Sequence, residues 1–204
     1  MERPRIGIVD CRSGNLRSVS KAVAHEGGEP EILSGVDEDW SGLILPGVGA
    51  FGHVMRNIEP IRRELVDYIE SGKPYLGICL GLQILFESSE EDPEPGLGIF
   101  KGRVTRVEAR KVPHIGWNSL DILRDSRILA GVRPGEYFYF VHSYAARPAD
   151  DEVLVATCNY DGDILASVVE RENVAACQFH PEKSGRAGLR VIRNFVEISR
   201  GMTR

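Results

Sequence analysis

Cys79 is the residue of this chain whose sequence setting best suits nucleophilic chemistry. It lies in Tyr75-Leu-Gly-Ile-Cys-Leu-Gly-Leu-Gln-Ile-Leu-Phe86, where a short apolar run passes through Gly-x-Cys-x-Gly into a helical pattern. Gly77 and Gly81 would let a strand and a helix approach closely while the cysteine projects outward. The first helical turn would stabilise a thiolate, and the backbone N–H of Leu80 would face an oxyanion formed beside the sulfur. A buried core cysteine at a strand end is the alternative interpretation.

A thiolate nucleophile also needs a general base and a group that orients the base. His180-Pro-Glu182 contains both residue types and directly follows an apolar run at 174–179 that predicts a strand. Doubly wound folds bind their ligands at the carboxyl ends of the strands, which is where this tripeptide would lie. Cys79, His180 and Glu182 are therefore predicted to form a catalytic triad. A surface turn with a solvated histidine is the alternative for this tripeptide.

A glycine-rich segment, Leu45-Pro-Gly-Val-Gly-Ala-Phe-Gly52, matches the Gly-x-Gly-x-x-Gly pattern of dinucleotide-binding loops. In dinucleotide-binding folds this fingerprint occupies the first βα turn, whereas here it follows the third predicted strand and contains Pro46. We interpret the segment as a source of free backbone N–H groups for an oxyanion hole that faces Cys79. Dinucleotide binding remains the weaker alternative.

Composition limits the classes of protein that the chain can represent. The 204 residues carry a formal net charge of −5, with 42% hydrophobic and 27% charged residues, which fits a single globular domain over 1–204. The negative charge argues against binding nucleic acid or an anionic membrane. The apolar run near the start is too short for a signal peptide or a membrane span, so we expect a cytoplasmic protein. The four cysteines lack CxxC spacing, which predicts reduced thiols and no metal site.

The elements that would position these residues follow from the apolar periodicity. Strands are predicted at 5–10, 30–33, 42–45 and 75–78, with helices at 16–25 and 61–71 and a loop at 13–15. Successive strands are then predicted at 103–108, 137–141, 153–160, 164–170 and 174–179, followed by a helix at 186–199. Asp161-Gly162 predicts a tight antiparallel turn, and 87–95 predicts an exposed loop. The expected fold is α/β, with a mostly parallel central sheet flanked by helices and an added antiparallel β layer.

Several ordered motifs together resemble a known family over essentially the whole chain. The chain resembles the class I, or triad, glutamine amidotransferases in four motifs: Pro46-Gly-Val-Gly49, Gly77-Ile-Cys-Leu-Gly-Leu-Gln83, Val141-His-Ser-Tyr144 and Gln178-Phe-His-Pro-Glu182. Within this flavodoxin-like family, it resembles the glutaminase subunits of imidazole glycerol phosphate synthases in four segments: 10–16, 46–51, Pro113-His-Ile-Gly-Trp-Asn118 and Phe138-Tyr-Phe-Val-His-Ser-Tyr144.

The resemblance implies hydrolysis of L-glutamine to L-glutamate and ammonia through a thioester, without a metal or an organic cofactor. Cys79 would attack the side-chain amide, His180 would move protons and Glu182 would orient the imidazole. The residues implied in binding are Val48, Gly49 and Leu80 for the oxyanion and Gly47, Gln83, Ser143 and Tyr144 for the substrate. His142 is expected to have a structural role.

The resemblance also implies a partner, the (β/α)8-barrel cyclase subunit of a heterodimeric enzyme of histidine biosynthesis. The cyclase would receive ammonia through a channel and form imidazole glycerol phosphate and a purine precursor, AICAR. Asn15, Trp117 and Lys183 would lie near this partner. Cys11-Arg12 departs from the Tyr-Gly usual in the family, so contacts there are expected to differ.

Two further alternatives remain for the function of the chain. One is a glutaminase subunit of another pathway, such as the pyridoxal phosphate, anthranilate or guanylate pathway, which the Gly-Trp-Asn and Val-His-Ser-Tyr segments argue against. The other is a non-catalytic binding subunit on the same fold, which the presence of all three triad residues argues against.

Overall fold

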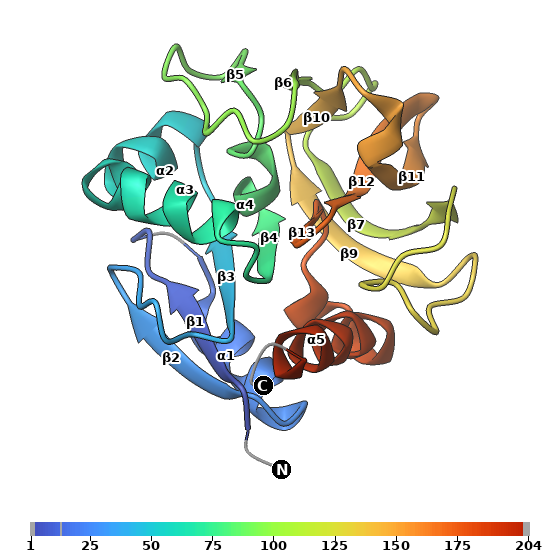
Figure 1. Cartoon of the computed structure of the whole chain (residues 1–204). Coiled ribbons are helices and arrows are strands. Elements are labelled where there is room, and N and C mark those ends of the chain that lie inside the picture. Colours follow the sequence, from blue (N-terminus) through green and yellow to red (C-terminus); the bar gives the residue numbers. More distant parts are fainter. Residues whose placement is uncertain (1–2, 13, 202–204) are drawn as a thin grey trace.

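A central sheet of eight strands organises the computed structural model, which describes residues 3–12 and 14–201. The strands, in spatial order, are β2 (Glu29–Leu33), β1 (Arg5–Val9), β3 (Gly42–Gly47), β4 (Tyr75–Cys79), β13 (Val174–Cys177), β12 (Asp163–Arg171), β11 (Leu154–Tyr160) and β8 (Asp121–Ile122). Neighbours from β2 to β13 are parallel, and those from β13 to β8 are antiparallel. Figure 1 shows β4 and β13 side by side near the middle of the molecule, where the parallel half meets the antiparallel half.

Two smaller sheets hold the other strands of the described residues. β6 (Gly102–Arg106) pairs antiparallel with β10 (Tyr144–Pro148) and parallel with β5 (Ser88–Ser89), and β7 (His114–Ser119) pairs antiparallel with β9 (Tyr137–His142). The predicted antiparallel part of the fold is therefore confirmed, and it is divided between an extension of the central sheet and these added sheets.

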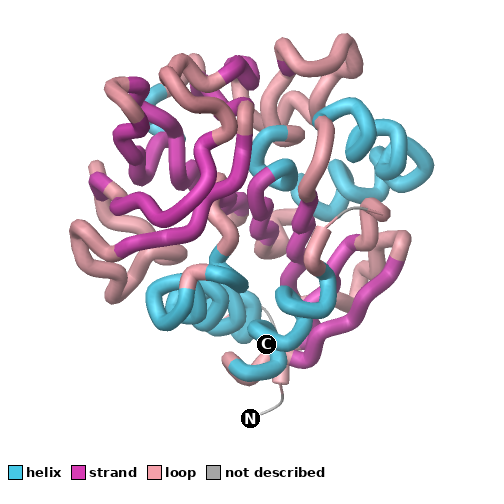
Figure 2. The backbone as a smooth tube through the Cα atoms, turned by 180° about the vertical axis from the view of Figure 1, so that it is seen from behind, coloured by secondary structure: helices cyan, strands magenta, loops and turns pink. Residues whose placement is uncertain are grey.

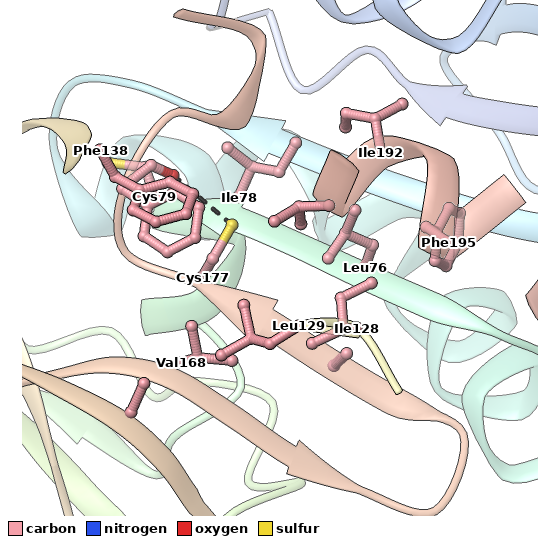
Figure 3. Packing of buried hydrophobic residues seen from close by; sticks show 14 of the residues in the cluster. Leu76, Ile78, Cys79, Ile128, Leu129, Phe138, Val168, Cys177, Ile192 and Phe195 are labelled. Atoms are coloured by element: carbon pink, nitrogen blue, oxygen red, sulfur yellow. Dashed lines mark hydrogen bonds between the residues drawn. The ribbon is translucent and has the colours of Figure 1, made fainter. Parts of the chain in front are cut away.

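Helices cover both faces of the parallel half of the sheet. The longer helices are α1 (Leu16–His25) and α5 (Gly185–Arg200) on one face and α2 (Phe51–Ile58) and α3 (Arg62–Glu70) on the other. Because successive strand residues point to opposite faces, Leu76 and Ile78 join the apolar cluster on the α1 and α5 face, and Tyr75 joins the opposite cluster. Figure 2 shows the helices on both sides of the strands from behind, and Figure 3 shows Leu76 and Ile78 within their cluster.

The short elements are α4 (Leu80–Gln83) and three 3-10 helices, η1 (Glu59–Ile61), η2 (Asp151–Val153) and η3 (Pro181–Lys183), within the described ranges. The helical pattern predicted after Cys79 is present as α4, which ends at Gln83. The carbonyl groups of Ile84 and Leu85 accept hydrogen bonds from the N–H groups of Leu97 and Phe100, at 2.7 and 2.9 Å, and are not available to continue a helix.

The other predicted elements are present, with ends that differ by a few residues. The predicted helix 16–25 coincides with α1, and the turn at Asp161-Gly162 joins β11 to β12 with positive φ angles of 57° and 95°. Residue 13 of the predicted loop lies outside the described residues. The strands β5, β7, β8 and β10 and the helix α2 were not among the predicted elements. All four cysteines are free thiols, as predicted, and all four are buried. The described residues contain no helix long and apolar enough to cross a membrane.

Candidate active site

The candidate site lies where three parallel strands end together. In β3 and β4, Gly47 pairs with Cys79, and in β4 and β13, Ile78 pairs with Cys177. The next residue after β13, Gln178, therefore lies beside Cys79. Because the carboxyl ends of parallel strands share one edge, the sequence-distant segments that follow β3, β4 and β13 meet at this edge.

Cys79 has the sharp strand-to-helix turn that the glycine spacing predicts. Its backbone has φ 56° and ψ −103°, a conformation that costs about 1–3 kcal/mol for a residue with a side chain. A Cβ atom on Gly77 would lie 2.3 Å from the carbonyl oxygen of Gly81, and one on Gly81 would lie 1.8 Å from that of Leu45. Only glycine fits at both positions, so the two glycines permit the turn that exposes the sulfur to the site.

His180 and Glu182 form a buried pair next to Cys79. Nδ1 of His180 lies 3.0 Å from Oε1 of Glu182, and the two side chains are 2% and 1% exposed. Nδ1–H therefore donates to the carboxylate. Nε2 of His180 has no hydrogen-bond partner among the described residues and stays available for proton transfer.

The charge of His180 results from opposing influences. Burial lowers the pKa of His180, but its interactions with Cys79 and Glu182 raise it, and the net result is a pKa of about 9. The imidazole is therefore mostly protonated at neutral pH. A cation at this position stabilises a thiolate on Cys79.

A cavity of about 250 Å³ adjoins the sulfur of Cys79. It is lined by most of the residues that are predicted from the sequence to bind the substrate or the oxyanion: Val48, Gly49, Leu80, Gln83, Ser143 and Tyr144. Gly47, which is also predicted at the substrate, is buried and does not line the cavity. A Cβ atom on Gly47 would lie 2.9 Å from Cβ of Leu80, so this glycine allows β3 to approach the start of α4.

Glu91, Pro113, Val141 and His142 also line the cavity and were not among the predicted substrate or oxyanion residues. Glu91 belongs to the loop predicted as merely exposed. Its Oε2 accepts a hydrogen bond from the backbone N–H of Phe51, at the first residue of α2, at 2.8 Å. A loop carboxylate of this kind gives no local sequence signal, because only its distant partner reveals its place.

The start of α2 is occupied by carboxylates of the chain itself. Besides Glu91, the carboxylate of Asp92 lies where a Cβ atom on Gly52 would stand, at 2.0 Å. A dinucleotide-binding loop places a pyrophosphate at the N-terminus of this helix, and two carboxylates there would repel it. The geometry therefore disfavours dinucleotide binding at the glycine-rich segment.

His142 is neutral and fixed by hydrogen bonds. Burial lowers its pKa to about 3. Nδ1 of His142 lies 2.8 Å from the carbonyl oxygen of Tyr144, so it carries the proton and donates to that oxygen. This arrangement supports the structural role that is expected for His142.

Two of the three residues predicted at a partner interface lie close together. Trp117 is 56% exposed and contacts Tyr139 edge to face, with ring centroids 6.0 Å apart. Nζ of Lys183 lies 5.7 Å from the centre of the same tyrosine ring. Asn15 lies in a different segment, immediately before α1, and its side chain does not cap that helix.

Cys11, where the sequence departs from the expected pattern, contacts the segment that is predicted to contribute to the oxyanion hole. Its sulfur donates a hydrogen bond to the carbonyl oxygen of Pro46 at 3.1 Å. The side chain of Asn57 donates to the carbonyl oxygen of Cys11 at 2.9 Å. Cys11 therefore connects the loop before α1 to the segment that follows β3.

The chain is similar to a described protein family, to named proteins and to solved structures. Residues 8–198 match the family described as "Glutamine amidotransferase class-I". Two similar proteins are both named "Imidazole glycerol phosphate synthase subunit HisH". The one from Thermococcus kodakarensis is 48% identical over 93% of this chain and 98% of its own length. The one from Methanothermobacter thermautotrophicus is 50% identical over 96% of this chain and 99% of its own length. The solved structure of PurLQS from Thermotoga maritima matches with a TM-score of 0.77 and 24% identity, covering 96% of this chain and 99% of that chain, which concerns the fold alone.

Proposed function

The chain belongs to the class I glutamine amidotransferase family, and from this premise we propose that Cys79, His180 and Glu182 hydrolyse L-glutamine to L-glutamate and ammonia. The observation that carries the proposal is the meeting of Cys79 with the buried His180–Glu182 pair beside a cavity. The nearly full-length similarity to subunits of imidazole glycerol phosphate synthase supports a more specific proposal, the glutaminase subunit of that enzyme in histidine biosynthesis.

In the first step, the thiolate of Cys79 attacks the side-chain carbonyl carbon of glutamine and a C–S bond forms. The carbonyl electrons move to the oxygen, which the backbone N–H groups of Leu80 and of Val48 or Gly49 would stabilise. The imidazolium of His180 gives its Nε2 proton to the amide nitrogen, the C–N bond breaks and ammonia leaves.

In the second step, water hydrolyses the thioester. Neutral His180 removes a proton from the water through Nε2, and the water oxygen attacks the thioester carbon. The C–S bond breaks, the thiolate of Cys79 returns and glutamate is released. Glu182 keeps Nδ1 of the imidazole protonated and the ring oriented through both steps.

The cavity contains groups that suit the amino-acid end of glutamine. Glu91 has an acidic side chain and lines the cavity, and it would pair with the α-ammonium group of glutamine. Gln83, Ser143 and Tyr144 line the same cavity and would contribute side-chain and backbone hydrogen bonds. Gly47 would act indirectly, by allowing Leu80 to approach β3.

The proposed partner is a (β/α)8-barrel cyclase subunit, which would use the ammonia in a heterodimer. The face of β7 and β9 that carries Trp117 supports a docking role, because Ile115 and Tyr137 on the same face are also 58% and 60% exposed. Lys183 lies beside this face through its contact with Tyr139, and we propose Asn15 as an additional contact. We still expect that residues 1–204 form a single amidotransferase domain and that the protein is cytoplasmic.

Glutamate release tests the activity and the partner together. We would measure it for the chain alone and with a cyclase subunit and its nucleotide ligand, in wild type and in Cys79→Ala. Stimulation by the cyclase that disappears in Cys79→Ala is expected. An active enzyme that the cyclase does not stimulate would overturn the pathway assignment. Absence of glutamate under every condition would overturn the catalytic proposal and favour a binding subunit.

A further inference from the structure

The side chain of Gln178 makes a contact with the nucleophile that the mechanism above does not use. Gln178 directly follows β13, and parallel pairing of β13 with β4 brings it beside Cys79. Its side chain is fully buried, and its Nε2 lies 3.6 Å from the sulfur of Cys79. A side-chain amide therefore points a polar group at the reacting atom.

The surrounding hydrogen bonds determine which end of the amide faces the sulfur. The carbonyl oxygen of Tyr144 can only accept, so the atom of Gln83 that lies 2.9 Å from it is the nitrogen. The same nitrogen lies 3.1 Å from the Gln178 amide and donates its other hydrogen there, which makes the receiving atom Oε1. The remaining end of the Gln178 amide, its NH2 group, must then face the sulfur of Cys79.

A second set of hydrogen bonds holds the Tyr144 carbonyl in place. Nδ2 of Asn118 donates to the carbonyl oxygen of Asn159 at 2.9 Å and lies 3.4 Å from Nε2 of His114, which must therefore accept. Nδ1 of His114 then donates to Nε2 of His142 at 3.1 Å, and Nδ1 of His142 donates to the Tyr144 carbonyl at 2.8 Å. In this hydrogen-bond network from Asn118 to Cys79, each contact therefore joins one donor to one acceptor, and no two hydrogens face each other.

We propose that Gln178 is a further catalytic residue, whose Nε2–H donates a hydrogen bond to the sulfur of Cys79 and stabilises its thiolate. Gln83 is the positioning residue that keeps the amide in this orientation. The inference rests on the proposed function. A donor favours the thiolate because an anionic sulfur accepts a stronger hydrogen bond than a neutral thiol.

Gln178 would also act in the second step of the reaction. In that step His180 takes a proton from water, and the sulfur of Cys79 becomes a thiolate again as the C–S bond breaks. When water attacks the thioester, the thiolate leaves from carbon, and Gln178 is the donor already in place on the sulfur. Loss of this donor is therefore expected to slow hydrolysis of the thioester and to let the acyl-enzyme accumulate.

Alkylation of Cys79 by iodoacetamide tests the hydrogen bond without glutamine or a partner, so the outcome is independent of the proposed function. The rate is measured against pH, and peptide mass spectrometry identifies Cys79 among the four cysteines. Gln178→Met keeps a similar chain length but removes the donor, and is expected to raise the midpoint of the pH profile by about one pH unit. An unchanged midpoint in this variant would overturn the proposal.

Ser167→Ala is the matched control. Ser167 is fully buried, and its contact with Gln178 is a backbone hydrogen bond at 2.9 Å that the substitution retains. This variant disturbs the packing beside β13 but keeps the amide donor, so the midpoint of Cys79 alkylation is expected to equal that of wild type. A shift equal to that of Gln178→Met would attribute the effect to packing and would also overturn the proposal.

Nuclear magnetic resonance provides a test that does not depend on the folding of a variant at Gln178. The sequence contains only two glutamines, Gln83 and Gln178, so side-chain 15N labelling of glutamine reports the two amides of this network. The Gln178 NH2 signal of wild type is expected to shift with pH at the midpoint of Cys79 alkylation, and this shift should be absent in Cys79→Ala. Gln83→Met assigns the signals. A Gln178 signal that does not respond to Cys79 would contradict the proposed donor.

Discussion

At the scale of single residues, the charge of His180 depends on Glu182. Burial of this imidazole opposes protonation, and the carboxylate at 3.0 Å is one of the two partners that reverse the effect. Under the proposed mechanism, the proton for the leaving amide nitrogen is therefore held on a ring that would be neutral at neutral pH if burial acted alone.

Replacing Glu182 by glutamine should expose this dependence. Glu182→Gln removes the negative charge and is expected to lower the pKa of His180 from about 9 and to reduce glutaminase turnover about tenfold or more at neutral pH. Turnover measured against pH checks both effects. Glu197→Gln, at an exposed residue paired with Arg200, is the control and should behave as wild type. An unchanged pH profile in Glu182→Gln would contradict the assigned role.

The sequence predicts some site residues and not others for a physical reason. Cys79 and His180 are recognisable because a cysteine and a histidine are reactive residue types at the ends of apolar runs, and the carboxyl ends of such strands meet in this class of fold. Cys79 is the last residue of β4, and His180 lies three residues after β13. Glu91 and Gln178 are not recognisable in the same way. Their roles depend on a loop that folds back onto α2 and on the register between β13 and β4, and neither is encoded locally.

At the scale of elements, the turn between β4 and α4 depends on the absence of a side chain at Gly81. Gly81→Ala would place a Cβ atom 1.8 Å from the carbonyl oxygen of Leu45, which is backbone and cannot move aside. We expect a loss of about 3 kcal/mol in the free energy of unfolding and loss of glutaminase activity. Urea denaturation and glutamate release measure these effects. Gly35→Ala is the matched control, because a Cβ atom there meets nothing within 4 Å. Equal stability of the two variants would contradict this account.

The exposed face of β7 and β9 should contribute to partner binding more than to folding. Trp117→Ala is expected to weaken binding to a cyclase subunit about tenfold or more, with little change in thermal stability, because the side chain is 56% exposed. Leu123→Ala removes an equally exposed apolar side chain, also 56% exposed, that lies outside these strands and serves as control. Titration calorimetry distinguishes them. Equal affinities for the two variants would exclude Trp117 from the interface.

Two of the elements that were not predicted, α2 and β7, differ in the strength of their local sequence signal. The apolar residues Phe51, Val54, Met55 and Ile58 have helical spacing, so α2 has a local signal beside the glycine-rich segment. β7 lacks such a signal, because Gly116 interrupts it at φ 130° and its outward face carries apolar side chains. A strand with exposed apolar residues cannot show the usual alternation of apolar and polar residues.

At the scale of the whole molecule, three buried histidines should limit stability on both sides of neutral pH. Burial lowers the pKa of His114 to about 4 and that of His142 to about 3. Below pH 6.5 the unfolded chain therefore binds protons at these two histidines that the folded chain does not bind. Stability is therefore lost as pH falls from 6.5. The pKa of His180 is raised to about 9, so the folded chain retains a proton that the unfolded chain releases, and stability is lost as pH rises from 6.5 to 9.

Urea denaturation across this range measures the prediction. The free energy of unfolding is expected to be greatest near pH 6.5 and to fall by several kcal/mol toward pH 4. His142→Asn removes one of the two groups responsible and should make the decline below pH 6.5 less steep. A decline as steep as in wild type would show that other groups cause it.

The position of β13 has a consequence for how the chain is made. This strand begins at Val174, late in the sequence, yet it lies between β4 and β12 in the middle of the sheet. While the ribosome is still translating the preceding residues, the emerging polypeptide already contains Cys79 but lacks His180, so under the proposed mechanism it cannot yet hydrolyse glutamine. β4, whose residues are all buried in the finished sheet, would meanwhile have an unpaired side, which makes a prematurely terminated chain prone to aggregate. Complete synthesis is thus required both to cover the apolar strand and to begin catalysis.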